Sequence, residues 1–482
     1  MENLQKYSQI VFFTRNPHYS HHLALAERMS ANFPKEKMIF ATFFSKAAAA
    51  VEKAGYKVFY IPGELRKYKS VNPDPEVIRR VEKEISTFDS KLSLDIMLAS
   101  ERFLPKRKSE HKQFCWQHIA VLDQLIKPGT LAMSSMFDHF VYWLAGTLTN
   151  SRKGAYFAFN ACGVPAGSMA LRTPWEAWEG PISRDANACW EDTKVKLFEP
   201  VEKRIDYMGP MLKRPLLRDN LRLYFRNVFK YDRKDGRMGS YFSYYPNLYG
   251  FVKGWFVAKY RQKAYHEPEY DIHSLSDLRK LGESKCIFVA LHMEPEATIL
   301  MYSPWFQDQY ELCSEIRACL PKEVPIVIKE NPKMRGKRPL DYYHRLRDLG
   351  NVHLVAPTVP AVPLMQESKA VVSLAGNACL EAVFMSIPSI VIGCPPFRHI
   401  LSDSDFSGEK GLDKSRLSAW LNDPKCATPE NVSVEWAKWV RGTLDAESLP
   451  IWQGEERHIN STPENLDKFI DYMDFCSAKV FE

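Results

Sequence analysis

The segment from Lys369 to Pro396, KAVVSLAGNACLEAVFMSIPSIVIGCPP, decides the fold. Its apolar runs predict short strands at Ala370–Leu374 and Ser389–Ile392, with a helix at Cys379–Met385 between them. Apolar strands on both sides of an apolar helix are typical of a parallel sheet that is covered on both faces. The segment therefore predicts an α/β fold.

A membrane-spanning helix is the alternative for this segment, because no Lys or Arg occurs from Ala370 to Phe397. Pro388 and the Gly376-Asn377 pair would interrupt such a helix. We therefore favour strand, loop, helix and strand.

The loop before the predicted helix consists of small residues, so a ligand can approach its backbone. Unpaired N–H groups at a helix start favour a phosphate group, and Glu381 could reach a ribose hydroxyl beside it. In the alternative interpretation the loop only makes a turn and Glu381 caps the helix. The candidate nucleotide-binding residues here are Ser373, Gly376, Asn377, Ala378 and Glu381.

Composition indicates an ordinary soluble protein of 482 residues, with 45% hydrophobic and 26% charged residues. This length exceeds one usual core, so we expect two domains. The N-terminus lacks a signal-peptide pattern, and the ten cysteines contain no C-x-x-C pair, which together favour the cytoplasm. The net charge of +7 suits an acidic substrate or an anionic membrane surface and does not require nucleic acid.

The first 61 residues alternate strands and helices, with strands expected at Gln9–Thr14, Lys37–Phe43 and Lys57–Ile61. This alternation predicts a doubly wound sheet without the G-x-G-x-x-G dinucleotide motif. Ligands of such sheets bind beyond strand ends, so Asn16 and His18 are candidate contacts for a sugar or an acceptor. His18, His21 and His22 could bind a metal, form a polar helix entry or contact sugar or phosphate. Since no carboxylate or cysteine lies nearby in sequence, we predict no metal.

Asp138 follows the strand expected at Thr130–Ser135, where a catalytic carboxylate would lie. It could instead cap the helix that begins at Phe140. Glu101 and Arg102, at the end of an expected helix, are further candidate contacts for the acceptor or the sugar. After Gly163-Val164-Pro165 we expect a polar loop.

A second α/β unit is expected from about residue 285, with strands at Cys286–Leu291, Val324–Ile328 and Val352–Val355. Polar residues follow these strands, and carboxyl ends of parallel strands share one edge of a sheet. We therefore expect one crevice lined by His292, Lys329, Asn331 and the Gly376 loop. Glu294, after the first of these strands, is a candidate contact for the acceptor or the sugar.

The expected domains are an N-terminal Rossmann-like acceptor lobe (1–200), a helical linker (201–280), a C-terminal donor lobe (281–400) and a helical tail packing across the lobes (401–482). The linker is basic and aromatic. It could contact an anionic inner membrane, or pack its aromatic face on a domain.

Two such lobes suit the transfer of a group from a phosphate-linked donor. Lys329 and the Gly376–Asn377 amides would neutralise the phosphates without a metal or another cofactor. Asp138 could act as a base on an acceptor hydroxyl or as a nucleophile. His292 could protonate or bind the leaving phosphate, the alternative being an ordinary loop histidine.

Four stretches resemble the bacterial capsule-polysaccharide biosynthesis proteins, a branch of GT-B glycosyltransferases that includes the β-Kdo transferases. They are FVALHMEPEATI (288–299), VIKENPK (327–333), NVHLVAP (351–357) and VVSLAGNACLEAVFMSIPSIVIG (371–393). The resemblance implies a GT-B-like fold, a CMP-linked ulosonic acid donor such as CMP-Kdo, and a growing glycan or glycolipid as acceptor. Asn331 stands where the family usually has a histidine that contacts donor phosphate.

Three other functions are compatible with the sequence. They are a sugar-nucleotide epimerase, a non-catalytic factor for polysaccharide binding or export, and a glycerol-phosphate polymerase. An epimerase needs several carboxylates around the sugar and no acceptor, whereas the basic-aromatic linker favours a large acceptor.

Overall fold

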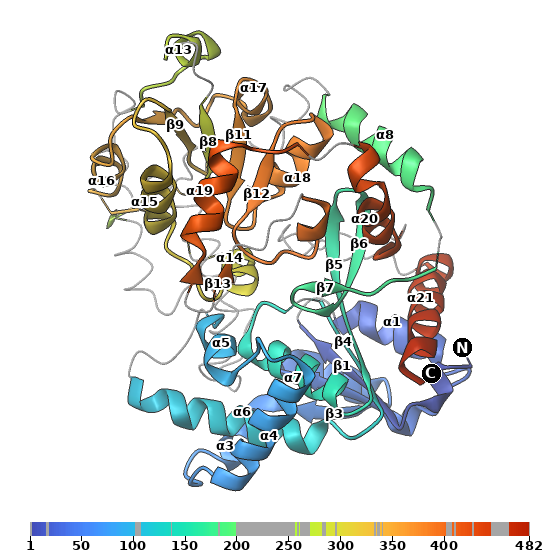
Figure 1. Ribbon diagram of the computed structural model, residues 1–482. Helices are drawn as coiled ribbons and strands as arrows, with labels where there is room; N and C mark the ends of the chain where they lie inside the picture. Colours follow the sequence, from blue (N-terminus) through green and yellow to red (C-terminus); the bar gives the residue numbers. More distant parts are fainter. Residues whose placement is uncertain are drawn as a thin grey trace. The chain divides into compact units, whose positions relative to one another are not determined.

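Two mainly parallel sheets organise the chain, in a computed structural model of residues 1–482 (Figure 1). The structure describes residues 2–15, 19–101, 108–135, 137–181, 184–198, 256–257, 260, 270–281, 286–294, 296–331, 334, 338–339, 341–401, 407–408, 411–426, 429–444 and 462–481. The chain divides into two units. The described residues of unit 1 come from Met1–Ala186 and Lys438–Glu482, and those of unit 2 from Asn187–Tyr224 and Asn247–Ala437.

Unit 1 contains an eight-stranded sheet. Its strands are β1 (Gln9–Thr14), β2 (Met38–Thr42), β3 (Lys57–Tyr60), β4 (Thr130–Ser134), β5 (Ala155–Gly163), β6 (Ala166–Thr173), β7 (Glu176–Ala177) and β15 (Thr443–Leu444). The order β3-β2-β1-β4-β5 is parallel throughout, which is the strand order of a doubly wound nucleotide-binding fold.

The helices of unit 1 cover both faces of this sheet. They are α1 (Tyr19–Met29), α2 (Ser45–Lys53), α3 (Ile61–Lys67), α4 (Pro75–Phe88), α5 (Leu94–Ala99), α6 (His111–Leu125), α7 (Phe140–Ser151) and α21 (Pro463–Phe481). Apolar side chains of α1, α2 and α21 share one core with β1, β2 and β4. Helix α7 is buried from Phe140 through Thr149, as expected for a helix that is apolar on all sides.

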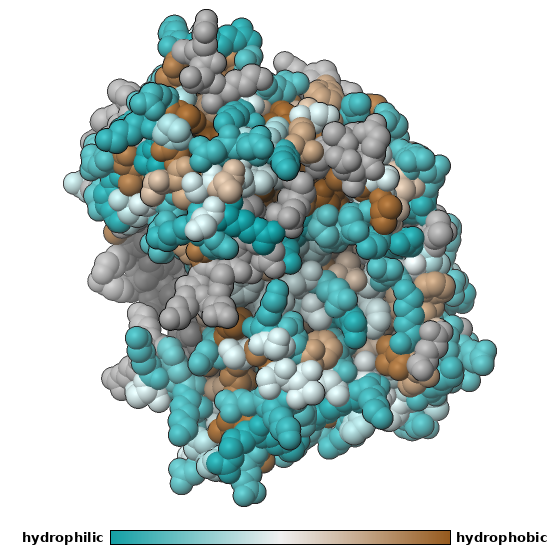
Figure 2. All heavy atoms as spheres, viewed as in Figure 1, coloured by the Kyte–Doolittle hydropathy of each residue, from teal (hydrophilic) through white to brown (hydrophobic). Residues whose placement is uncertain are grey.

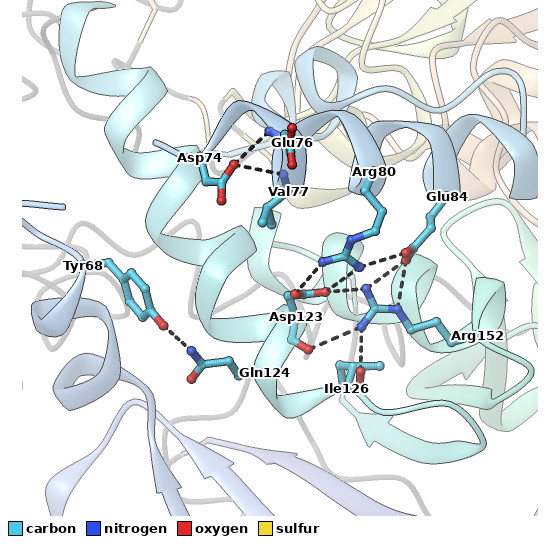
Figure 3. Close-up of polar contacts among 10 residues, drawn as sticks. All are labelled: Tyr68, Asp74, Glu76, Val77, Arg80, Glu84, Asp123, Gln124, Ile126 and Arg152. Carbon is cyan, nitrogen blue, oxygen red and sulfur yellow. Dashed lines mark hydrogen bonds and ion pairs between the residues drawn. The ribbon is translucent and has the colours of Figure 1, made fainter. Parts of the chain in front are cut away.

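An ion-pair network fixes the helices around α4 (Figure 3). Arg80 contacts Glu84 at 3.1 Å and Asp123 at 2.8 Å, and Arg152 contacts the same carboxylates at 2.9 and 2.6 Å. Because Asp123 lies on α6 and Arg152 directly follows α7, these contacts join three helices of unit 1.

The expected polar loop after Gly163-Val164-Pro165 is wrong. Residues Ala166–Thr173 form strand β6, which pairs antiparallel with β5 over the whole turn region. A tight turn returns the chain beside the strand that it has just left, whereas a parallel neighbour requires a crossover.

Unit 2 contains a five-stranded parallel sheet. Its strands are β8 (Ile287–Ala290), β9 (Ile326–Lys329), β10 (Val352–Val355), β11 (Ala370–Ser373) and β12 (Ser389–Val391), and β13 (Ser407–Gly408) pairs with β14 (Gly411–Leu412) as a separate ribbon. The order β10-β9-β8-β11-β12 repeats the doubly wound order of unit 1. The predicted α/β fold with two Rossmann-like units is therefore confirmed.

Unit 2 also has helices on both faces of its sheet (Figure 1). The helices of unit 2 are α8 (Ala186–Leu197), α13 (Leu275–Arg279), α14 (Ala297–Tyr302), α15 (Gln309–Cys319), α16 (Tyr342–Arg347), α17 (Ala361–Gln366), α18 (Asn377–Phe384), α19 (Lys414–Asn422) and α20 (Pro429–Arg441), whose last residues, from Lys438, belong to unit 1. Side chains of α15, α16 and α19 share one core with alternate residues of the strands. Helix α18 begins at Asn377, two residues before the predicted start at Cys379, because Gly376 occupies the N-cap position.

The structure describes little of the expected linker but much of the expected tail. Most of 201–280 lies outside the described residues. The expected tail contributes to both units, since residues up to Ala437 belong to unit 2 and α21 packs on α1 in unit 1.

The visible face of the molecule is mostly hydrophilic, with apolar side chains in small groups (Figure 2). Among the described residues, none of the helices has both the length and the apolar character that crossing a membrane requires.

Candidate functional site

The candidate site of unit 2 lies where its strand order reverses. From β8 the chain builds outward through β9 to β10, and it then returns to the other side of β8 as β11. In open α/β sheets ligands bind beyond the carboxyl ends of the strands at this switch point. His292 follows β8 and Ser373 is the last residue of β11, so these two predicted site residues lie together at the switch point.

The backbone of His292 is held on both sides. Its N–H donates to Gln309 Oε1 at 2.6 Å, and its carbonyl accepts from Gln309 Nε2 at 3.2 Å and from Arg338 Nη2 at 2.9 Å. All three residues are buried. These backbone hydrogen bonds fix the position of His292 independently of the contacts of its ring.

The ring of His292 bridges the two strand ends. Nε2 lies 3.0 Å from Ser373 Oγ and accepts the N–H of Ala375 at 3.2 Å. Nδ1 lies 3.2 Å from Glu296 Oε2. Ser373 Oγ is also 3.1 Å from the carbonyl oxygen of Ala290, so the switch point of unit 2 is closed by a continuous set of polar contacts.

Gly376 allows this arrangement because it has no side chain. A Cβ at this position would lie 2.7 Å from Ser373 Oγ and 3.3 Å from His292 Nε2. As the N-cap residue of α18, glycine also offers no side-chain oxygen to the first N–H groups of the helix. Asn377 is exposed and Ala378 and Glu381 are half-buried, so a ligand can reach the helix start.

Lys329, the last residue of β9, is buried and donates from Nζ to the Pro357 carbonyl oxygen at 3.0 Å. Burial lowers the pKa of Lys329 to about 8, although neighbouring Glu330 favours its charged form. Asn331, two residues after Lys329, donates its N–H to Glu330 Oε1 at 2.8 Å. The predicted gathering of Lys329 and Asn331 at the carboxyl edge is thus present in the structure.

Sequence reasoning missed a buried ion-pair network beneath the site. Arg338 forms ion pairs with Glu330 and, at 2.7 Å, with Glu294, a predicted sugar contact. Tyr343 Oη donates to Glu330 Oε2 at 3.1 Å. Burial raises the pKa of the Glu330 carboxyl, and Arg338 opposes this rise. One feature of the sequence indicates this network: Glu330 directly follows a buried strand, and a buried carboxylate requires a counter-charge.

Unit 1 has a corresponding switch point between β1 and β4. Arg15, which follows β1, forms a bidentate ion pair with Asp138, with Nη1 at 3.0 Å from Oδ2. Arg15 Nε also donates to Tyr142 Oη at 3.2 Å. Burial disfavours the charge of Arg15, but the combined interactions with Asp138 and Tyr142 outweigh this effect and raise the pKa of the guanidinium.

Glu101 provides the helix-capping hydrogen bond that the alternative interpretation assigned to Asp138. Its carboxylate accepts the Phe140 N–H at 3.0 Å, at the start of α7, and lies 3.2 Å from His139 Nδ1. The other predicted residues of this region, Asn16, His18 and Arg102, lie outside the described residues.

His21 and His22 are buried and line a small cavity beside the carboxyl end of β4, together with Ser134, Ser135, Phe159 and Phe469. Burial lowers the pKa of His21 to about 4. In the part of the chain that the structure describes, no cluster of three or more His, Cys, Asp or Glu side chains could hold a metal ion.

No family model and no curated protein matches this chain. Among solved structures, the chain is similar to KpsC of Thermosulfurimonas dismutans, a β-Kdo 2,7 transferase, with a TM-score of 0.30, 13% identity and coverage of 68% of this chain and 80% of that one. It is also similar to a UDP-GlcNAc 2-epimerase from Neisseria meningitidis (TM-score 0.23, 11% identity, 98% of each chain). The third is Anabaena Alr3699/HepE, in complex with UDP and glucose (TM-score 0.26, 10% identity, 98% of this chain and 97% of that one). Because these TM-scores are low, the function of the chain is inferred from the residues of the site.

Proposed function

We propose that the protein is a glycosyltransferase that moves a sugar from a nucleotide donor to a glycan or glycolipid acceptor. The observation that supports this proposal is the gathering of His292, Lys329, Ser373 and Gly376 at the carboxyl ends of three neighbouring strands of unit 2. In this fold a nucleotide binds at that edge.

The donor phosphates would bind at the start of α18. The first N–H groups of a helix have no partner within it and carry a partial positive charge. Gly376 leaves them open to a ligand, and Lys329 supplies a cation at the same edge. These groups would stabilise the departing phosphate without a metal.

Unit 1 would bind the acceptor, with Asp138 as the base for its hydroxyl or as a nucleophile. Arg15 balances the charge of Asp138. An acceptor that takes over the Arg15 contact would release the carboxylate for proton transfer. The sugar or the acceptor would also contact the remaining predicted residues, which are Asn16, His18, Glu101, Arg102 and Glu294.

The finer proposal is a CMP-linked ulosonic acid such as CMP-Kdo as donor and a surface polysaccharide as acceptor, at the cytoplasmic face of an anionic membrane. It rests on the four stretches that resemble the capsule-polysaccharide proteins. Asn331, in place of the family histidine, makes the nucleotide the first property to test.

The test is thermal stabilisation of the whole protein by CMP, CDP, UDP and GDP at equal concentrations, since a ligand that binds only the folded state raises Tm. We expect CMP alone to raise Tm, and we expect Lys329→Met to reduce the effect. The exposed variant Arg28→Ala serves as control, because Arg28 pairs on the surface with Asp467 of α21. A shift with UDP or GDP alone would reject the CMP donor. No shift with any nucleotide would reject the donor site.

A further inference from the structure

Three side chains of unit 2 stand in a row at the switch point. Glu296 Oε2 lies 3.2 Å from His292 Nδ1, and His292 Nε2 lies 3.0 Å from Ser373 Oγ. Carboxylate, imidazole and serine follow one another in this order in acyl-transfer enzymes. Ser373 is fully buried, however, and its Oγ also contacts the Ala290 carbonyl oxygen, so a substrate cannot reach it. The row must therefore serve another purpose.

The backbone of Ala375 determines where the proton of the His292 ring lies. The Ala375 N–H is directed at Nε2, with a separation of 3.2 Å between the two nitrogens. An N–H donor requires a lone pair on its partner, so this contact favours an Nε2 without a proton. The Ser373 hydroxyl has a single proton that can rotate, and in this arrangement it donates that proton to Nε2 and not to the Ala290 carbonyl oxygen, 3.1 Å from Oγ. In a neutral imidazole the proton is then on Nδ1, which donates it to the Glu296 carboxylate.

Glu296 is the most exposed member of the row, with 21% of its side chain exposed against 10% for His292. We infer that Glu296 is a positioning residue that holds His292 in the Nδ1–H tautomer and thereby secures the Ala375 amide. The opposite tautomer would place an Nε2–H against the Ala375 N–H. Two donors would then face each other, and the 374–376 loop would lose the hydrogen bond of its Ala375 N–H, although the Leu374 carbonyl oxygen would still accept from the Gly393 N–H at 2.7 Å.

This inference deepens the proposed function, on which its link to the donor rests. Gly376 directly follows Ala375 and caps α18. A displaced Ala375 amide would therefore move the N–H groups that are proposed to bind the donor phosphate. A single hydrogen bond of this kind corresponds to a change of roughly 3- to 10-fold in nucleotide affinity.

Two variants separate the effect of the Glu296 acceptor from that of its charge. Glu296→Gln keeps an oxygen that accepts from Nδ1–H but removes the charge. Glu296→Ser is too short to reach the ring, while serine is a favourable residue at the N-cap of α14, where Glu296 lies. Glu311→Ser is the control, an exposed glutamate in the first turn of α15.

The primary measurement is ¹⁵N NMR of histidine-labelled protein, with the His292 signals assigned through His292→Gln. It is combined with hydrogen exchange of the Ala375 amide, and neither measurement requires a ligand. We expect the Nδ1–H tautomer and a protected amide in the native protein, Glu296→Gln and Glu311→Ser, and loss of both in Glu296→Ser. An Nε2–H tautomer in the native protein, or an unchanged ring in Glu296→Ser, would overturn the inference.

Nucleotide affinity is measured separately on the same variants. If the native protein binds none of the four nucleotides, the proposed function fails, while the tautomer and the Ala375 amide still decide the role of Glu296. If a nucleotide binds and Glu296→Ser alone weakens it, the positioning role extends to the donor site. Equal affinity in all variants would reject that extension.

Discussion

Arg15 and Asp138 join the carboxyl ends of β1 and β4 by a bidentate ion pair, at the switch point of unit 1. His292 and Ser373 join the ends of β8 and β11 at the same topological position of unit 2, by a contact of 3.0 Å. Each unit thus holds its switch point together with a pair of polar side chains. The pair in unit 1 carries full charges, whereas the pair in unit 2 combines an imidazole with a hydroxyl.

The first prediction concerns the Arg15–Asp138 pair, both of whose side chains are at least 89% buried. Asp138→Ala should lower the free energy of unfolding by about 3–5 kcal/mol, because it removes the carboxylate that forms a bidentate ion pair with a buried guanidinium. The double variant Arg15→Met/Asp138→Leu should recover much of this loss. Urea denaturation measures both.

The surface offers a matched control, since Arg28 and Asp467 form a bidentate pair with both contacts at 2.7 Å. Asp467→Ala should leave the urea midpoint nearly unchanged, because exposed ion pairs contribute little. An Asp138→Ala variant as stable as Asp467→Ala would contradict the prediction. In that case, a loss of activity in Asp138→Asn would be assigned to the chemical role of the carboxylate and not to unfolding of the protein.

The second prediction is an acid-sensitive unit 1. The pKa of His21 is lowered to about 4 by burial, whereas an unfolded histidine titrates near its ordinary value of 6.5. Between these values the unfolded chain holds more protons, so stability is full above about pH 6.5 and falls as the pH decreases toward 4. This single group accounts for about 3 kcal/mol.

His21→Leu should therefore flatten the decline of the free energy of unfolding between pH 6.5 and 4. His118, whose pKa is also lowered by burial, should maintain part of the slope. His273→Gln is the control variant, at an exposed histidine of unit 2. If His21→Leu and the native protein lose stability in parallel, His21 does not titrate as its burial requires.

The sequence predicted the parallel strands well because each is a short apolar run, and burial on both faces makes this pattern local. Strand β11, expected at Ala370–Leu374, lies at Ala370–Ser373. Strand β6 was missed because Ser168, Arg172 and Thr173 give it the polarity of a loop. It becomes a strand only because the turn returns it alongside β5.

The position of the candidate site followed from strand ends, but its contacts did not. Arg15 and Asp138 are 123 residues apart, and their meeting depends on β1 and β4 being neighbours. Arg338 lies in a basic, proline-containing stretch that is typical of a surface loop. Its burial against Glu330 and Glu294 is a tertiary contact, which no local pattern specifies.

The third prediction tests Lys329 as a phosphate contact. Its pKa is lowered to about 8, so its positive charge is present below that pH and is lost as the pH rises through it. The Kd of the proposed nucleotide, CMP, should therefore increase between pH 7 and 9.5. Isothermal titration calorimetry measures this change.

Lys329→Met should bind more weakly at pH 7 and show little dependence of Kd on pH over that interval. Lys369→Met is the control, because Lys369 precedes β11 at the amino edge of the sheet and donates to Leu421 and Asn422 carbonyl oxygens. It should retain the pH dependence. An identical pH profile in Lys329→Met and the native protein would place the phosphate away from Lys329.

The last prediction addresses the close approach at Gly376. A Cβ in Gly376→Ala would lie 2.7 Å from Ser373 Oγ, and the 0% exposure of Ser373 leaves its side chain little room to move. Overpacking of this kind should lower the free energy of unfolding by about 1–3 kcal/mol. Ser373→Ala removes the oxygen, so the double variant Gly376→Ala/Ser373→Ala should be more stable than the sum of the two single effects predicts.

Ser389→Ala is the matched control for this cycle. Ser389 is likewise buried and donates from Oγ to the Cys379 carbonyl oxygen at 2.8 Å, but it is not among the atoms nearest to a Cβ at Gly376. Combined with Gly376→Ala it should give additive losses. Additivity in both cycles would mean that the 374–376 loop yields to the extra methyl group, and that His292 and Ser373 do not hold it as closely as the contacts indicate.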